Sequence, residues 1–72
     1  MEKRDFLILV GKRIKEEREQ KGWSQADLAY RIGKDQPSIN RVEKGHSNPT
    51  IFYLKEIANG LDVSLQELIK GV

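Results

Sequence analysis

The feature that most constrains this chain is the stretch Ser24–Lys44, in which two short amphipathic segments flank the break Gly33-Lys34-Asp35. In the first segment Leu28, Ala29 and Ile32 recur at a spacing that forms one apolar stripe on a helix of 3.6 residues per turn. Glycine adopts positive φ without steric cost, so the break is typical of a tight turn after a helix end. The stretch therefore predicts two short helices joined by that turn.

Both predicted helices have a capping residue at their start. Ser24 can accept a hydrogen bond from the backbone N–H of Asp27, whose carboxylate can return the bond in a capping box. Asp35 caps the second helix, and Pro37 lies in its first turn, where a missing N–H has no intrahelical partner to lose. Trp23 precedes the first cap, and we expect it to pack back on the helix as a core residue.

The rest of the apolar pattern predicts further helices before and after this pair. Phe6, Val10 and Ile14 recur every four residues, with Leu7 beside them. A second stripe consists of Ile51, Leu54, Ile57, Ala58 and Leu61. A capping-box sequence, Ser64 to Glu67, opens a last short helix that presents Leu65, Leu68 and Ile69. The chain is thus expected to be all-α, with helices over about Lys3–Gln20, Ser24–Ile32, Asp35–Lys44, Thr50–Leu61 and a segment from Ser64.

Length and composition narrow the class of protein. The 72 residues leave room for one domain, residues 1–72, with a small core. The chain has no cysteine and one histidine, which excludes disulfides and thiol nucleophiles and argues against a metal site. The apolar run Phe6–Val10 is far shorter than the ~20 residues that span a bilayer. We expect a cytoplasmic protein without cofactor, metal or small-molecule ligand.

The polar residues of the Asp35–Lys44 helix indicate a binding function. Ile39 and Val42 face inward, which leaves Gln36, Ser38, Asn40 and Arg41 on the outward side. Amide and guanidinium groups pair with adenine and guanine edges in the major groove of DNA. The net charge is only +2. Cations are nevertheless concentrated near this helix, as in nucleic-acid binders, at Lys34, Arg41, Lys44 and His46.

Many positions across the chain share one further pattern. They are Arg18, Gly22-Trp23-Ser24-Gln25, Leu28-Ala29, Gly33, Ile39, Arg41–Gly45, Asn48-Pro49-Thr50, Ile57-Ala58 and Leu61–Ser64. With this spacing, roughly residues 10 to 69 resemble the Cro/C1-type helix-turn-helix family of phage repressors and their bacterial relatives. The resemblance implies a compact five-helix, lambda-repressor-like DNA-binding domain whose second and third helices form the helix-turn-helix.

The resemblance also implies roles for single residues, with the Asp35–Lys44 helix lying in the major groove of double-stranded DNA. The expected base contacts are Gln36, Pro37, Ser38, Asn40 and Arg41. The expected phosphate contacts are Ser24, Gln25, Lys34, Lys44, His46, Ser47, Asn48 and Tyr53. Pro37 offers only apolar contact, and the stem of Lys34 either snorkels or points to the phosphates. Arg18 and Glu43 match a pair of residues that commonly forms an ion pair between two helices in this family.

One recognition helix reads too few base pairs to select a genomic site, so we expect a homodimer on a palindromic operator with half-sites ~34 Å apart. The apolar residues Leu65, Leu68, Ile69 and Val72 form the expected dimer interface. The alternative, that these side chains face the core of one chain, remains open.

The predicted function is transcriptional regulation, as a repressor or autoregulator. An enzyme is not expected, because the chain lacks a nucleophile–base pair and Gly33-Lys34-Asp35 lacks the rest of a P-loop. A protein-binding role, such as that of an antitoxin, remains an alternative. Binding that ignores salt and is unaffected by Arg41→Ala would favour this second reading.

Overall fold

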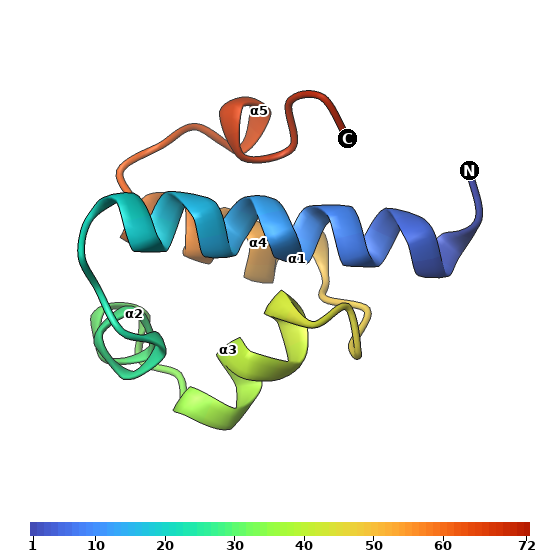
Figure 1. The fold of residues 1–72 in the computed structure, drawn as a ribbon. Coiled ribbons are helices and arrows are strands. Elements are labelled where there is room, and N and C mark those ends of the chain that lie inside the picture. Colours follow the sequence, from blue (N-terminus) through green and yellow to red (C-terminus); the bar gives the residue numbers. More distant parts are fainter.

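The computed structural model describes all 72 residues and contains five helices and no strand, which confirms the all-α prediction. The helices are α1 (Lys3–Gln20), α2 (Gln25–Ile32), α3 (Gln36–Glu43), α4 (Ile51–Gly60) and α5 (Leu65–Leu68). The long helix α1 crosses the molecule, with α5 on one side, α2 and α3 on the other and α4 behind (Figure 1). None of the helices is long and apolar enough to cross a bilayer.

The last four helices begin one residue after their predicted starts, because those residues are caps. In each case the cap side chain accepts a hydrogen bond from the backbone N–H three residues on: Ser24 from Asp27, Asp35 from Ser38, Thr50 from Tyr53 and Ser64 from Glu67. The complete capping box forms at α2, where Ser24 N–H donates to Asp27 Oδ2 at 2.8 Å. At α5 only the Ser64 half of the predicted box is present.

The turn between α2 and α3 has the predicted geometry. Gly33 is the C-cap of α2, with a left-handed φ of 69°, a conformation that favours glycine. The next residue, Lys34, donates its backbone N–H to Ala29 O at 2.9 Å and so closes the end of the helix. This turn sets the direction in which α3 leaves α2.

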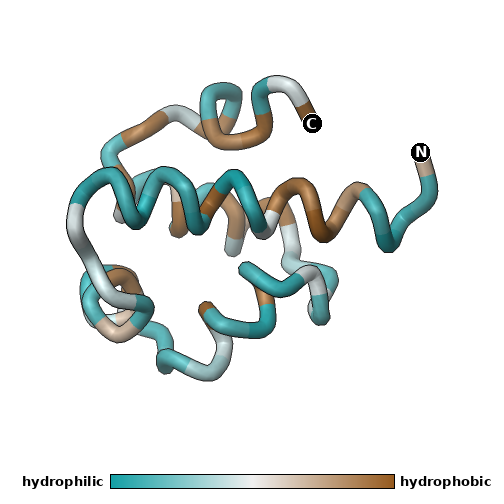
Figure 2. The backbone as a smooth tube through the Cα atoms, viewed as in Figure 1, coloured by the Kyte–Doolittle hydropathy of each residue, from teal (hydrophilic) through white to brown (hydrophobic).

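The core contains ten buried apolar residues, and every helix or its C-cap contributes: Val10, Ile14, Leu28, Ala29, Ile39, Val42, Ile57, Ala58, Leu61 and Leu68. Trp23 packs partly buried against them, in agreement with its predicted core role. Two residues of the predicted stripes are exposed instead, Phe6 by 41% and Ile51 by 74%. Both lie in the first turn of their helices. Figure 2 shows that α1 begins with a hydrophilic first turn, is hydrophobic over the next turns and is mostly hydrophilic toward its C-terminus.

The helix α5 corrects part of the predicted dimer interface. It has only four residues, and Leu68 has none of its surface exposed. Leu68 therefore belongs to the core of the single chain and cannot contact a second copy in this conformation. Val72 also packs against the core, although partly buried. For Leu68, the alternative prediction that the side chain faces the core of one chain is therefore correct. The short helix α5 turns its apolar side inward and packs against α1 and α4.

A glycine lets α3 approach α1 closely. A Cβ atom at Gly11 would lie 2.4 Å from the carbonyl oxygens of both Val42 and Glu43. No other residue type fits here without moving the last turn of α3, because backbone cannot yield as a flexible side chain does. The end of α3 is thus held directly against the middle of α1.

Candidate nucleic-acid interface

The predicted base-reading residues share the accessible side of α3. Gln36, Pro37 and Arg41 are exposed, and Ser38 and Asn40 are partly exposed. The buried residues of the same helix are Ile39, Val42 and Glu43. The amphipathic pattern therefore leaves one face of α3 free to contact a ligand.

An ion pair fixes the other side of α3 to α1, as the family resemblance implied. Arg18 Nε and Nη2 donate to the two Glu43 carboxylate oxygens at 2.7 and 2.9 Å, and each residue is only 7% exposed. The hydrogen bond to Glu43 raises the pKa of Arg18. Arg18 Nη1 also donates to Trp23 O at 2.7 Å. The Glu43 charge is consequently paired inside the protein and does not face a ligand on α3.

A chain of hydrogen bonds continues from this ion pair to the start of α3. Gln25 Nε2 donates to Glu43 Oε1 at 3.0 Å, and Gln36 Nε2 donates to Gln25 Oε1 at 2.6 Å. Each amide keeps a second N–H, and Gln36 also keeps its Oε1 acceptor. Gln36 is thus oriented while a donor and an acceptor remain available. The sequence analysis did not predict these hydrogen bonds, because no periodic pattern links residues on two different helices.

Arg41 and Ser38 also contact each other. Arg41 Nη2 donates to Ser38 Oγ at 3.2 Å, while the Ser38 backbone N–H donates to the Asp35 cap at 2.7 Å. Hydrogen bonds from Ser38 lower the pKa of the Asp35 carboxyl, so the cap stays ionised at neutral pH. The guanidinium of Arg41 is therefore held along the exposed side of α3.

The predicted phosphate contacts differ in how accessible their side chains are. Ser24, Lys44, His46 and Asn48 are exposed and accessible, and Gln25 is partly exposed. Lys34 takes the snorkelling alternative, because its Nζ lies 5.2 Å from the centroid of the Tyr53 ring and 3.4 Å from Glu56 Oε1.

Two of the predicted phosphate contacts are corrected by the structure. Ser47 Oγ and Tyr53 Oη are buried and have no hydrogen-bond partner. Burial raises the pKa of the Tyr53 hydroxyl. Neither hydroxyl can contact a phosphate in this conformation, and the Tyr53 ring instead packs against the core and supports Lys34. The sequence favoured exposure because both residues are polar and lie in or beside a loop.

A helix-turn-helix family model matches residues 14–68. The chain belongs to the Cro/C1-type helix-turn-helix family. Members of this family are DNA-binding transcriptional regulators, in agreement with the family resemblance read from the sequence.

One protein similar to this chain is the HTH-type transcriptional regulator y4dJ of Sinorhizobium fredii. The two are 37% identical over 90% of this chain and 84% of the relative. Other regulators that match are longer, and the chain spans 56% of SinR from Bacillus subtilis.

Solved structures show the same fold. The restriction-modification controller protein C.AhdI from Aeromonas hydrophila superposes with a TM-score of 0.89 at 32% identity, covering 94% of this chain and 99% of that one. The controller protein C.Esp1396I, solved as a tetramer in complex with its natural 35-base-pair operator, has a TM-score of 0.78 at 36% identity. That match covers 90% of this chain and 96% of the controller.

Proposed function

We propose that this protein is a sequence-specific regulator of transcription that binds double-stranded DNA with α3 in the major groove. The observation that carries the proposal is the exposed face of α3, on which Gln36 is held by Gln25 with one donor and one acceptor free. A side chain fixed before binding loses less conformational freedom when it meets its ligand. The operator complex of the similar controller C.Esp1396I supports the same partner.

The chemistry of the α3 face suggests which bases each residue reads. The Arg41 guanidinium matches the O6 and N7 acceptors of guanine. Gln36 and Asn40 can each pair with the N6 donor and N7 acceptor of adenine. The ring of Pro37 can contact a thymine methyl, and Ser38 can bond a base or a phosphate. Together these groups contact a short run of bases in one half-site.

The DNA backbone is proposed to lie against the start of α2 and the loop after α3. Unpaired backbone N–H groups at the start of a helix attract an anion. Gln25 keeps one free N–H there beside the Ser24 cap. On the other side of the groove, Lys44, His46 and Asn48 are exposed and can contact phosphates.

We further propose that the protein binds a palindromic operator as a homodimer and represses or autoregulates the adjacent promoter. The exposed apolar residues at the start of α4, Ile51 and Phe52, are 74% and 69% exposed. Ile69 is 36% exposed, and Leu65 and Val72 are partly buried. Single exposed apolar side chains are normal on a monomer, but exposed apolar side chains that lie together mark interfaces. Ile51 and Phe52 thus join Leu65, Ile69 and Val72 as the proposed dimer contacts.

Binding to a pool of random-sequence duplexes at two salt concentrations tests the DNA-binding proposal. Affinity should fall by at least about tenfold between 50 and 200 mM salt, because phosphate contacts release counterions. Gln25→Ala should weaken this binding, whereas the exposed control Lys12→Gln on α1 should leave the affinity for the duplexes nearly unchanged. Binding that is absent, or that ignores salt, contradicts the proposal and supports the protein-binding alternative.

A further inference from the structure

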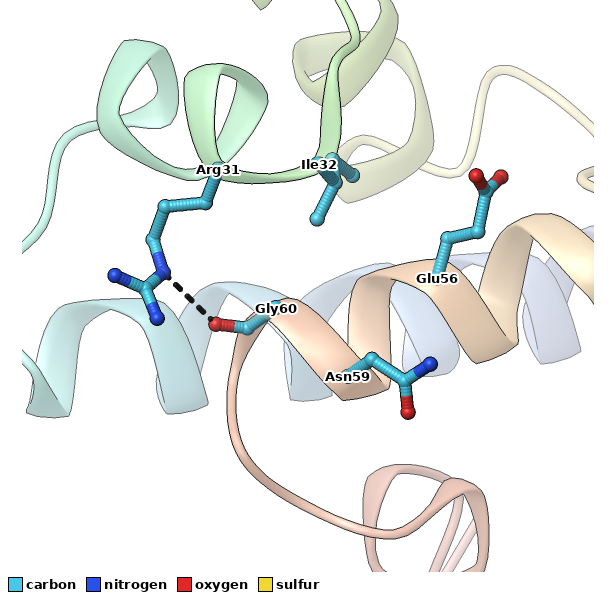
Figure 3. Close-up of a pocket in the computed structure, with 5 residues that line it drawn as sticks. All are labelled: Arg31, Ile32, Glu56, Asn59 and Gly60. Atoms are coloured by element: carbon cyan, nitrogen blue, oxygen red, sulfur yellow. Dashed lines mark hydrogen bonds between the residues drawn. The ribbon is translucent and has the colours of Figure 1, made fainter.

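The guanidinium of Arg31 is held in one position by two residues that are not among the proposed DNA contacts, Gly60 and Trp23. Its Nε donates to Gly60 O at 3.1 Å, so the side chain reaches from α2 to the end of α4 (Figure 3). Its guanidinium carbon lies 4.3 Å from the centroid of the Trp23 ring. Stacking on tryptophan and a backbone hydrogen bond together restrict the orientation of the group.

The two terminal nitrogens of Arg31 have no partner in the protein. Nε–H is the only side-chain donor of Arg31 that makes a hydrogen bond, and no carboxylate lies within ion-pair distance. Arg13 and Arg18, in contrast, are paired with Glu17 and Glu43. A fixed guanidinium with both Nη groups free has the fork geometry that binds a carboxylate through two parallel hydrogen bonds.

Two shallow pockets meet at Arg31. The α2–α4 pocket has a volume of about 300 Å³ and is lined by Arg31, Ile32, Glu56, Asn59 and Gly60 (Figure 3). The Trp23 pocket has a volume of about 360 Å³ and is lined by Trp23, Asp27, Tyr30 and Arg31. None of the residues proposed to contact DNA lines either pocket. Arg31 therefore stands between a polar pocket and an aromatic one.

The aromatic pocket offers both cationic and apolar surface. Lys21 Nζ lies 5.6 Å from the centroid of the Trp23 ring, which places a second cation near that ring. Tyr30 is 89% exposed although its ring is large and apolar. Such an exposed ring beside a cation can cover an apolar side chain of a partner while its hydroxyl stays in water.

We propose that this surface docks a segment of a partner protein in which a carboxylate side chain neighbours an apolar one. The carboxylate binds the free Nη groups of Arg31, and the apolar side chain packs against Trp23 and Tyr30. Asn59 is exposed and lines the α2–α4 pocket, and its side-chain amide, which makes no hydrogen bond in the protein, can bond the backbone of the segment. The site adds a protein partner to the proposed DNA-binding function and does not depend on it.

Two acidic residues favour a peptide over a nucleic acid as the occupant. Asp27 lines the Trp23 pocket, and its carboxylate is held by the Ser24 backbone N–H, a hydrogen bond that lowers its pKa. Glu56 lines the other pocket and is paired with Lys34. A phosphate backbone carries one charge per nucleotide and would meet these carboxylates on both sides of Arg31. A segment with a single carboxylate avoids them.

Trp23 is the only tryptophan of the chain, so its fluorescence reports directly on this site. The probe is the peptide acetyl-Gly-Leu-Glu-Leu-Gly-amide, and its matched control has glutamine in place of glutamate. The glutamate peptide should change the emission saturably, with an affinity at least about tenfold above the control, as expected for hydrogen bonds between charged groups. Arg31→Gln should abolish this difference, whereas Lys12→Gln, which removes one charge elsewhere, should preserve it.

The fold of each variant is checked by its thermal midpoint. If Arg31→Gln unfolds, Tyr30→Ala provides the test, since the exposed Tyr30 ring makes little contribution to the core. Loss of this ring should weaken the binding of the glutamate peptide. Equal titration by the two peptides, or no change up to millimolar peptide, overturns the proposal. It is also overturned if random duplex DNA displaces the peptide and Arg31→Gln weakens DNA binding, because the site would then hold a phosphate.

Discussion

At the scale of single residues, the buried pair of Arg18 and Glu43 has the largest expected effect on stability. Removing one partner leaves a buried charge unpaired, which costs about 3–5 kcal/mol. Glu43→Ala should therefore lower the free energy of unfolding by about this amount, measured by urea denaturation. The matched change Glu56→Ala, in the more exposed pair with Lys34, should cost about 0–1 kcal/mol. Similar losses in the two variants would show that the Arg18 pair is not effectively buried.

Gln25 is expected to act on DNA in two ways. It lies at the proposed phosphate contact and also holds Gln36 at 2.6 Å. Gln25→Ala should weaken binding to random duplexes, and it should additionally relax the preference at the base that Gln36 reads. Gln36→Ala should relax the same base with little effect on random DNA. Base preferences measured for both variants check this, and an unchanged preference in Gln25→Ala would contradict the positioning role.

At the scale of helices, the caps of α2 and α3 predict a pH dependence. Hydrogen bonds lower the pKa of Asp27 and Asp35 in the folded state below the ordinary 3.8. The stabilisation is therefore complete above that value and is lost as the pH falls through the lowered folded pKa. Thermal melting between pH 7 and pH 2.5 should show this loss. Asp35→Asn, which can still cap but does not titrate, should show a smaller one, and equal acid sensitivity would contradict the account.

Most of the helices could be predicted from the sequence, whereas contacts between helices could not. Periodic apolar residues and the caps at Ser24 and Asp35 located α1, α2, α3 and α4 to within a residue at each end, because these signals are local. The exposure of Phe6 and Ile51 was missed, since it depends on which turns of a helix other elements cover. The hydrogen bonds of Gln25 with Glu43 and with Gln36 were missed as well, because they join α2 to α3. The buried hydroxyl of Tyr53 likewise reflects tertiary packing and no sequence pattern.

At the scale of the whole molecule, dimer formation is expected to depend on the exposed apolar residues of α4. Phe52 is 69% exposed, so Phe52→Ser removes little from the core. It should shift the dimer toward monomer in sedimentation and leave the thermal midpoint of the monomer nearly unchanged. Tyr30→Ser, at an aromatic residue of α2 that is 89% exposed, is the matched control and should leave the dimer intact. A dimer unaffected by Phe52→Ser would place the interface elsewhere.

We propose above that α3 reads a specific DNA sequence as part of a dimer. The most direct measurement selects bound sequences from a random duplex pool at two salt concentrations, with the original protein and Arg41→Ala. We expect an inverted repeat with half-sites about one helical turn apart. Arg41→Ala should weaken the base preference at one position of each half-site and cost about 1–3 kcal/mol of binding free energy at that position. No enriched sequence, or a motif that Arg41→Ala leaves unchanged, would contradict the claim.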